Sequence, residues 1–132
     1  MAKIIVFNNS SNRMELYHRA ENEPMPYNLD RTLTVREFRG SSNSPTLWTT
    51  MRAIEAWNTT RRSFGSPINV GYAFKRPWEG GHAAQSQHYA GVAFDVGQRL
   101  TAAQRNNLRT LAQRLGVWTY VETVTQVIKT KQ

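Results

Sequence analysis

Hydrophobic and polar positions at the start of the chain predict a β-hairpin. The stretches KIIVF (residues 3–7) and RMELYHRA (13–20) are rich in β-branched, aromatic and long side chains, and the Asn- and Ser-rich turn NNSSN separates them. His18 in the second stretch is expected on the surface. A connection rich in Pro and Asn follows over residues 21–30.

The middle of the chain predicts one more strand and a long helix. Residues 31–38 (RTLTVREF) alternate like a half-buried strand. Residues 45–64 carry apolar side chains at helical spacing, with Ser44 as the N-cap, Pro45 at the first helical position and Gly65 as the stop. The apolar positions of this predicted core helix are Leu47, Met51, Ile54, Trp57 and Phe64.

The second half of the chain predicts strands on both sides of an irregular segment, followed by a helix. Residues 68–74 and 91–97 read as strands, whereas the sixteen residues between them (75–90) have no apolar period, which is typical of a functional loop. Residues 101–116 read as a helix that opens with a capping-box pattern, and residues 117–128 as one strand or two. The order predicts an α+β fold: a small mixed or antiparallel sheet, two main helices and the N-terminal hairpin.

Composition limits the architecture and the partners. A chain of 132 residues without repeats fits a single domain, 1–132. The excess of 17 Lys and Arg over 9 Asp and Glu gives a formal charge of +8, which favours anionic partners such as nucleic acid, an acidic membrane face or the bacterial cell wall. The first residues contain only four consecutive apolar positions, so we expect neither a signal peptide nor a membrane segment.

Asp95 is the first residue that points to chemistry. It lies within an otherwise apolar strand, where an uncompensated carboxylate costs several kcal/mol. A cluster of backbone N–H groups, an Arg, or a divalent cation with His88 as a second ligand would stabilise it. The chain has no cysteine, so any metal must be held by His, Asp or Glu. The spacing of His88 and Asp95 alone is weak evidence for a metal site and favours a structural ion pair or solvent-facing side chains.

The whole string from Ser86 to Asp95 matches the pattern Ser-x-His-x-x-Gly-x-Ala-x-Asp. This pattern resembles the motif of the zinc D-alanyl-D-alanine carboxypeptidases, a family that also includes vancomycin-resistance D-Ala-D-Ala dipeptidases and phage L-Ala-D-Glu endopeptidases. The resemblance covers roughly residues 33–122, with residues 1–30 as an N-terminal hairpin extension. It implies that His88 and Asp95 are zinc ligands and that Ser86 lies near the substrate.

The resemblance also implies a mechanism and further site residues. Zinc held by two His and one Asp polarises a water and the scissile carbonyl, and a nearby carboxylate, at the position of Glu122, acts as general base. The family often has an Arg directly after a Gly-Tyr pair, where this chain has Gly71-Tyr72-Ala73. Tyr72 is therefore assigned to substrate binding, and the cation is assigned to Arg76 or to Lys75 beside it.

The third zinc ligand is where this sequence departs from the family. The family has a histidine in its last strand, but no histidine follows Glu122 here. Three interpretations remain open: the site is incomplete, His82 or Glu122 completes it, or His88 and Asp95 persist on a scaffold that now serves binding.

These observations predict a zinc-dependent peptidase, made in the cytoplasm and acting on peptidoglycan stem peptides in the bacterial cell wall. A catalytically inactive module that binds cell wall or protein is the alternative. Nucleic-acid binding is the least favoured reading, because only the positive charge supports it.

Overall fold

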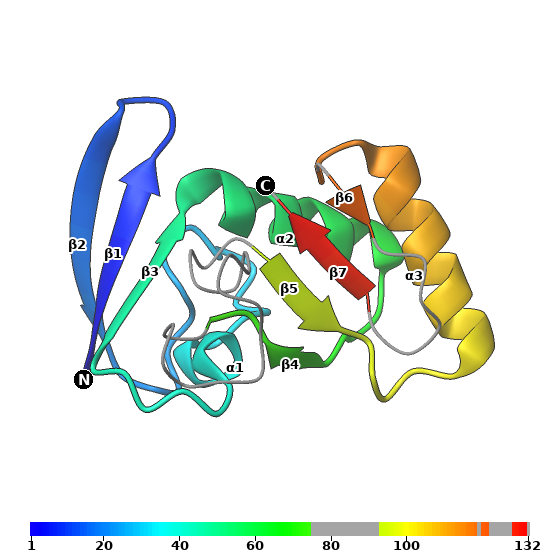
Figure 1. Ribbon diagram of the computed structural model, residues 1–132, viewed down its shortest axis with the longest axis horizontal. Helices are drawn as coiled ribbons and strands as arrows, with labels where there is room; N and C mark the ends of the chain where they lie inside the picture. Colours follow the sequence, from blue (N-terminus) through cyan, green and yellow to red (C-terminus); the bar gives the residue numbers. More distant parts are fainter. Residues whose placement is uncertain (75–92, 119, 122–127, 132) are drawn as a thin grey trace.

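The described residues form two β-sheets and three helices (Figure 1). The computed structural model describes residues 1–74, 93–118, 120–121 and 128–131. The strands are β1 (Ala2–Asn8), β2 (Arg13–Arg19), β3 (Thr46–Thr50), β4 (Val70–Tyr72), β5 (Ala93–Val96), β6 (Tyr120–Val121) and β7 (Ile128–Lys131). The helices are α1 (Val35–Arg39), α2 (Met51–Phe64) and α3 (Ala102–Leu115). The predicted α+β class is confirmed.

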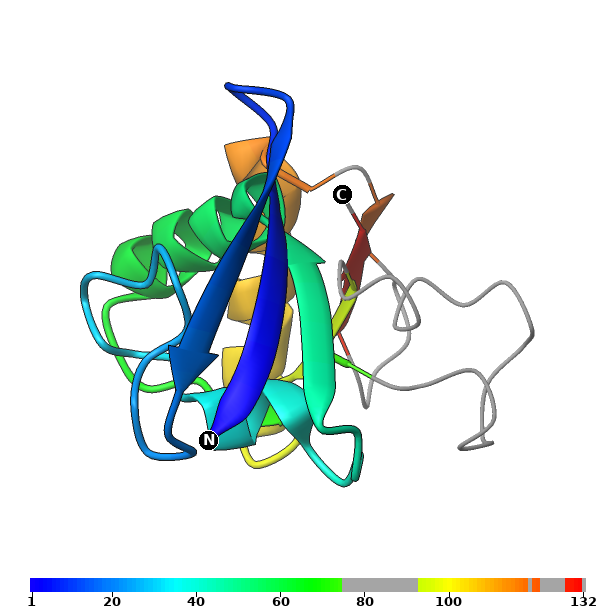
Figure 2. The same ribbon diagram turned by 90° about the vertical axis from the view of Figure 1, so that its left-hand side faces the viewer.

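The first sheet has the strand order β2-β1-β3 and contains the predicted hairpin. β1 and β2 pair antiparallel from Ala2↔Arg19 to Asn8↔Arg13, and β1 pairs in parallel with β3 from Lys3↔Thr46 to Phe7↔Thr50. Ala2, Ile4 and Val6, alternate residues of β1, are buried, which places one face of this sheet on the core. Figure 2 shows the opposite face of the sheet, with no helix in front of it.

The strand predicted over residues 31–38 is wrong, because α1 forms there. Thr34 caps the helix: its hydroxyl accepts from the Glu37 backbone N–H at 3.2 Å, and the Glu37 carboxylate accepts from the Thr34 backbone N–H at 2.9 Å. Val35 and Phe38 then lie one turn apart and are both fully buried. This reciprocal cap outweighs the apolar alternation of the segment.

The helix predicted over residues 45–64 is wrong in its first part. Residues 46–50 form β3, and the helix begins only at Met51, with Thr50 as its N-cap in place of Ser44. The Thr50 hydroxyl accepts from the Ala53 backbone N–H at 3.1 Å. The predicted stop is confirmed, since Gly65 ends α2 in the left-handed conformation with φ of 78°.

The second sheet has the order β4-β5-β7-β6 and pairs antiparallel throughout. In the described part of the chain, the strands predicted over 68–74 and 91–97 are present as β4 and β5. The second predicted helix is confirmed as α3, including the reciprocal cap between Thr101 and Gln104 and a left-handed Gly116 at its end. One hydrophobic cluster joins side chains from β1, β3, β5 and all three helices.

Candidate functional site

Asp95 lies on β5, between β4 and β7. Its register partners are Tyr72 on β4 and Lys129 on β7. Phe94 and Val96, on either side of it, are buried on the core face, so strand alternation directs Asp95 to the other face of the sheet. Asp95 is nevertheless only 4% exposed. Its carboxylate therefore occupies a sheltered position on a strand whose backbone is held from both sides.

Aromatic packing fixes β5 in place. Phe94 stacks on Trp57 of α2, with ring centroids 5.8 Å apart, and meets Trp118 edge-on at 5.6 Å. The indole N–H of Trp118 donates to the Thr60 hydroxyl of α2 at 2.7 Å, and both residues are buried. The prediction that Trp57 belongs to the core is confirmed, and Trp118 is buried as well. A strand anchored in this way holds Asp95 with little freedom.

Asn69 ties the start of β4 to the turn that follows β5. Its backbone carbonyl accepts from Gly97 N–H at 2.9 Å, and its side-chain oxygen accepts from Arg99 N–H at 2.9 Å. Its side-chain amide donates to Gln98 Oε1 at 3.0 Å. Gly97 has φ of 80°, a conformation that glycine adopts without strain. These bonds fix the position of β5 along β4.

An open cleft of about 450 Å³ lies at this end of the sheet. Its lining residues are Glu37, Asn69, Val70, Gly71, Gln98 and Arg99. The backbone of Gly71 contacts the side chain of Gln98 so closely that a Cβ there would lie 2.6 Å from Gln98 Nε2. Glu37, Asn69 and Arg99 of this lining were not predicted from the sequence. The only sequence signal for this cleft is the polar pair Gln98-Arg99 after Gly97, and such a pair is typical of an ordinary turn.

The structure brings together only part of the predicted site. The backbone of Tyr72 lies beside Asp95, which places the Gly-Tyr strand next to the Asp strand. The side chain of Tyr72 is not among those that the structure describes. The other predicted site residues also lie outside the described residues: Lys75, Arg76, His82, Ser86, His88 and Glu122. Within the described ranges, no group of three His, Asp or Glu side chains is placed to hold a metal ion. The described part supplies one of the expected ligands, Asp95, whose oxygen donors suit zinc.

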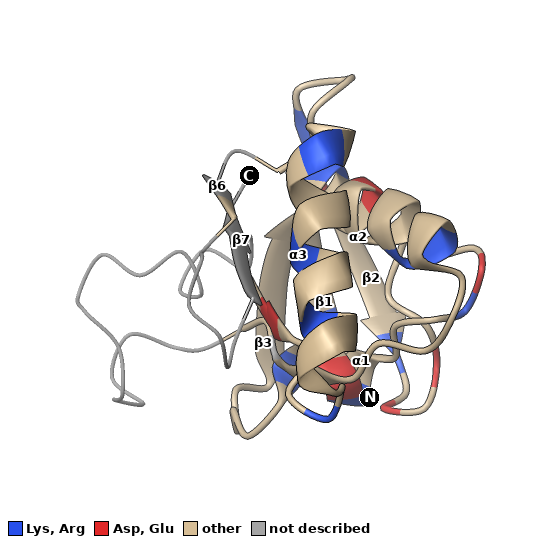
Figure 3. Cartoon of the chain, turned by 90° about the vertical axis from the view of Figure 1, so that its right-hand side faces the viewer, with Lys and Arg blue, Asp and Glu red and all other residues tan. Residues whose placement is uncertain are grey.

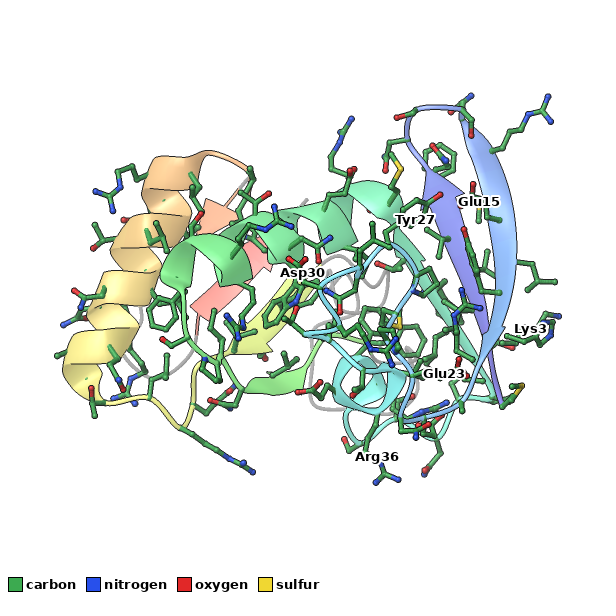
Figure 4. The ribbon with its side chains drawn as sticks, turned by 180° about the vertical axis from the view of Figure 1, so that it is seen from behind. Lys3, Glu15, Glu23, Tyr27, Asp30 and Arg36 are labelled. Carbon is green, nitrogen blue, oxygen red and sulfur yellow. The ribbon has the colours of Figure 1, made fainter. Side chains whose placement is uncertain are left out.

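A separate polar cluster forms around Glu15 on β2 (Figure 4). The Glu15 carboxylate accepts hydrogen bonds from the hydroxyls of Tyr27 and Tyr17 and from the Asn8 amide, which lies at 3.1 Å. These bonds, that from Tyr27 foremost, lower the pKa of Glu15, whereas the Glu15 carboxylate raises the pKa of Tyr27. None of these residues carries a role in the predicted peptidase chemistry, and the cluster fastens the hairpin to the loop after it.

Positive charge is carried prominently by α3 (Figure 3). The helix contains Arg105, Arg109 and Arg114 and no Asp or Glu. His18, which the sequence analysis placed on the surface, is exposed on β2. In the part of the chain that the structure describes, no helix has the length and apolar character needed to cross a membrane.

Comparisons with protein-family models, with curated protein sequences and with solved structures give no match for this chain.

Proposed function

We propose that this protein is a zinc-dependent peptidase that acts on the stem peptides of peptidoglycan. The observation that carries the proposal is the sheltered position of Asp95 on β5, next to the strand that bears Gly71 and Tyr72. Asp95 is the last residue of the motif that begins at Ser86, and its sheltered place on β5 supports the proposal. A carboxylate held on a rigid strand is suited to metal binding, because its geometry is set before the ion arrives.

His88 and Asp95 are the proposed zinc ligands, with His82 or Glu122 as candidates for a third. Zinc, when bound, supplies Lewis-acid polarisation of the scissile carbonyl and of the attacking water. If Glu122 is not a ligand, its carboxylate takes a proton from the water as the water adds to the carbonyl carbon. Glu122 then passes that proton to the leaving amine as the C–N bond breaks.

The remaining predicted residues bind the substrate. Arg76 stabilises the negative charge that develops on the carbonyl oxygen, or binds a substrate carboxylate. Ser86 and Tyr72 orient the peptide. The protein has a net charge of +8, and α3 contains no Asp or Glu. This positive charge attracts anionic polymers, which is consistent with a substrate embedded in an anionic cell wall.

Zinc titration by calorimetry tests this proposal. The wild-type chain should bind zinc at a single site, and both His88→Ala and Asp95→Asn should weaken that binding by at least about tenfold. His18→Ala is the matched control, because His18 is exposed on β2 and should leave zinc affinity unchanged. If the wild type binds zinc no better than His88→Ala does, the peptidase proposal fails.

Incubation with purified muropeptides then tests the reaction. Mass spectrometry should detect either released D-Ala or a new amino terminus, and a chelator should abolish both. The products identify which peptide bond is cut. An unchanged muropeptide profile with a zinc-loaded chain contradicts the proposed activity.

A second candidate, a binding module without catalysis, is favoured by one observation: residues 123–132, which include β7, contain no histidine. A module of this kind should sediment with isolated cell walls while leaving their peptides intact. Binding without product formation, unchanged by His88→Ala, is the result that favours it over the peptidase.

A further inference from the structure

β2 is an edge strand with an unusually regular, uninterrupted backbone. It lies at the end of the order β2-β1-β3 and matches β1 over seven consecutive pairs with no register shift. Its sequence, RMELYHR, contains neither Pro nor Gly. Among the strands that the structure describes, none pairs with its outer side, and Figure 2 shows it at the border of the sheet. Edge strands are often protected against further pairing by a Pro, a bulge or charged side chains. β2 has neither a Pro nor a bulge, and its charged side chains are Arg13, Glu15 and Arg19.

The direction of the backbone groups follows from a single bond. Lys3 N–H donates to the Pro45 carbonyl just before β3, so the N–H and C=O groups of Lys3 face β3, and those of its neighbours Ala2 and Ile4 face β2. The partners of Ala2 and Ile4, Arg19 and Tyr17, therefore direct their backbone groups toward β1.

The alternate residues of β2 direct their N–H and C=O groups toward the open edge. These residues are Met14, Leu16 and His18. Their side chains also lie on the uncovered face of the sheet, where Met14 is 62% and Leu16 55% exposed. The edge ends at Ala20, whose N–H donates to the Glu23 carboxylate at 2.6 Å. The open segment thus offers both hydrogen-bonding groups and apolar side chains to another strand.

The charges along β2 select the occupant and the register. Glu15 and Arg19 lie two residues on either side of Tyr17. When two copies of β2 pair antiparallel about Tyr17, Glu15 of each copy lies directly opposite Arg19 of the other, and opposite charges at such positions stabilise a sheet. Pairing about Leu16 would instead place Arg13 opposite Arg19, which is unfavourable.

We propose that the protein self-associates through β2, forming a two-fold symmetric dimer in which the two hairpin sheets join into one continuous six-stranded sheet. In the proposed pairing, Leu16 of one copy and His18 of the other exchange two backbone hydrogen bonds. The two-fold symmetry repeats this pair, which gives four hydrogen bonds between the edges. Glu15 has acceptor capacity left, since its carboxylate receives three hydrogen bonds within the chain.

Arg19 changes partner in this dimer. In the single chain its guanidinium stacks over the Tyr17 ring at 5.0 Å and donates to the His18 carbonyl at 3.2 Å. The proposed pairing needs that carbonyl for Leu16 N–H of the second copy, and it supplies Glu15 of that copy as the new partner of Arg19. In the monomer Arg19 thus donates to the backbone carbonyl of His18 at the open edge. In the dimer it forms an ion pair with Glu15 of the second copy instead.

Sedimentation equilibrium of the full chain tests the proposal. The chain should show a monomer–dimer equilibrium with a dissociation constant below about 0.1 mM. Leu16→Lys, which places a charge on the exposed edge, and Arg19→Glu, which opposes Glu15 with a like charge, should each raise the dissociation constant at least about tenfold. Arg36→Glu is the matched control, because it makes the same charge change on the exposed side of α1, away from the edge (Figure 4). Both edge positions are at least partly exposed, and circular dichroism verifies that each variant folds.

Cross-linking tests the register. The chain has no cysteine, so the double variant Leu16→Cys/His18→Cys introduces the only thiols. Cys at 16 should form a disulfide with Cys at 18 of the other copy under mild oxidation, whereas Leu16→Cys alone should cross-link much less.

Three results overturn the proposal. A chain that remains monomeric at about 0.1 mM excludes a dimer of useful strength. A dimer that neither edge variant weakens uses another surface. A dimer weakened by Leu16→Lys but not by Arg19→Glu, and cross-linked efficiently by Leu16→Cys alone, pairs about Leu16 and contradicts the Glu15–Arg19 register.

Discussion

The Tyr27 hydroxyl donates a hydrogen bond to the Glu15 carboxylate and so connects the loop after the hairpin to the middle of β2. Tyr27 adopts this position with φ of 70°, in the left-handed region that a tyrosine rarely occupies. The backbone of the loop accepts local strain, and the hydrogen bonds to Glu15 offset it.

Replacement of Glu15 by Gln should lower the stability of the protein at neutral pH and change its pH dependence. The hydrogen bonds from Tyr27, Asn8 and Tyr17 lower the pKa of Glu15 below its ordinary value of 4.5. Its contribution to stability is therefore fully present above pH 4.5 and is lost as the pH falls through the lower folded-state pKa. Urea unfolding at a series of pH values should show a gap between wild type and variant that closes in acid.

Glu55→Gln provides the control for that experiment, because Glu55 is exposed on α2 and lies outside the Glu15 cluster. Its unfolding curves should follow the wild type at each pH. A Glu15→Gln variant as stable as wild type at pH 7 contradicts a stabilising role of the cluster.

Thr60→Val should destabilise the protein by about 1 to 3 kcal/mol. The variant keeps the shape of the side chain but leaves the buried indole N–H of Trp118 without its acceptor. Thr59→Val, at the neighbouring half-buried position of α2, should change stability by less than about 0.5 kcal/mol. Denaturant unfolding followed by tryptophan fluorescence measures both, and equal effects of the two variants contradict the assigned bond.

Thr101→Ala should cost about 1 kcal/mol by removing the cap of α3. The Thr101 hydroxyl accepts from the Gln104 backbone N–H at 3.1 Å, and Gln104 reciprocates at 3.0 Å. Thr110→Ala, at an exposed position within the same helix, should be neutral or slightly stabilising, because Ala has the higher helix propensity. The midpoint of urea unfolding should therefore fall for Thr101→Ala, whereas for Thr110→Ala it should stay unchanged or rise slightly.

Glu122→Gln and His82→Ala distinguish the candidates for completing the proposed zinc site. If Glu122 is the general base, Glu122→Gln should reduce peptide hydrolysis by about 10² to 10⁴-fold while zinc affinity is retained. If His82 is the third ligand, His82→Ala should lower zinc affinity, with Glu122→Gln binding zinc as the wild type does. Loss of zinc affinity in Glu122→Gln assigns that carboxylate as a ligand instead. Retained affinity and activity in both variants leave neither residue in the site.

The elements that were predicted correctly are those with complete local signals. The hairpin has β-rich stretches around an Asn and Ser turn, and α3 has both a capping box and a terminal glycine. Such signals depend on residues within a few positions of each other, so they survive without knowledge of the rest of the fold.

The errors arose where distant contacts determine the structure. Residues 46–50 carry an apolar spacing that also fits a helix, and they become β3 because β1, more than forty residues earlier, pairs with them in parallel. α1 has a local signal in Thr34 and Glu37, which form a capping pattern in the sequence, but the prediction of a strand rested on apolar alternation alone.

Part of the candidate site was accessible to sequence reasoning. Asp95 stood out because a carboxylate interrupts an apolar strand, and the structure places it on β5 in a sheltered position. The role of Asn69 was not predictable, since its three bonds connect segments about thirty residues apart and its identity alone indicates only a turn.

The parallel pairing of β1 with β3 has a consequence for synthesis on the ribosome. β1 and β2 can form a hairpin as soon as residue 19 has emerged, but the apolar face of β1 is covered only when β3 and α2 follow. A two-stranded hairpin in isolation is at best marginally stable. The nascent chain therefore carries an unfinished sheet through the translation of about the next forty-five residues, because folding of this half of the molecule waits for α2.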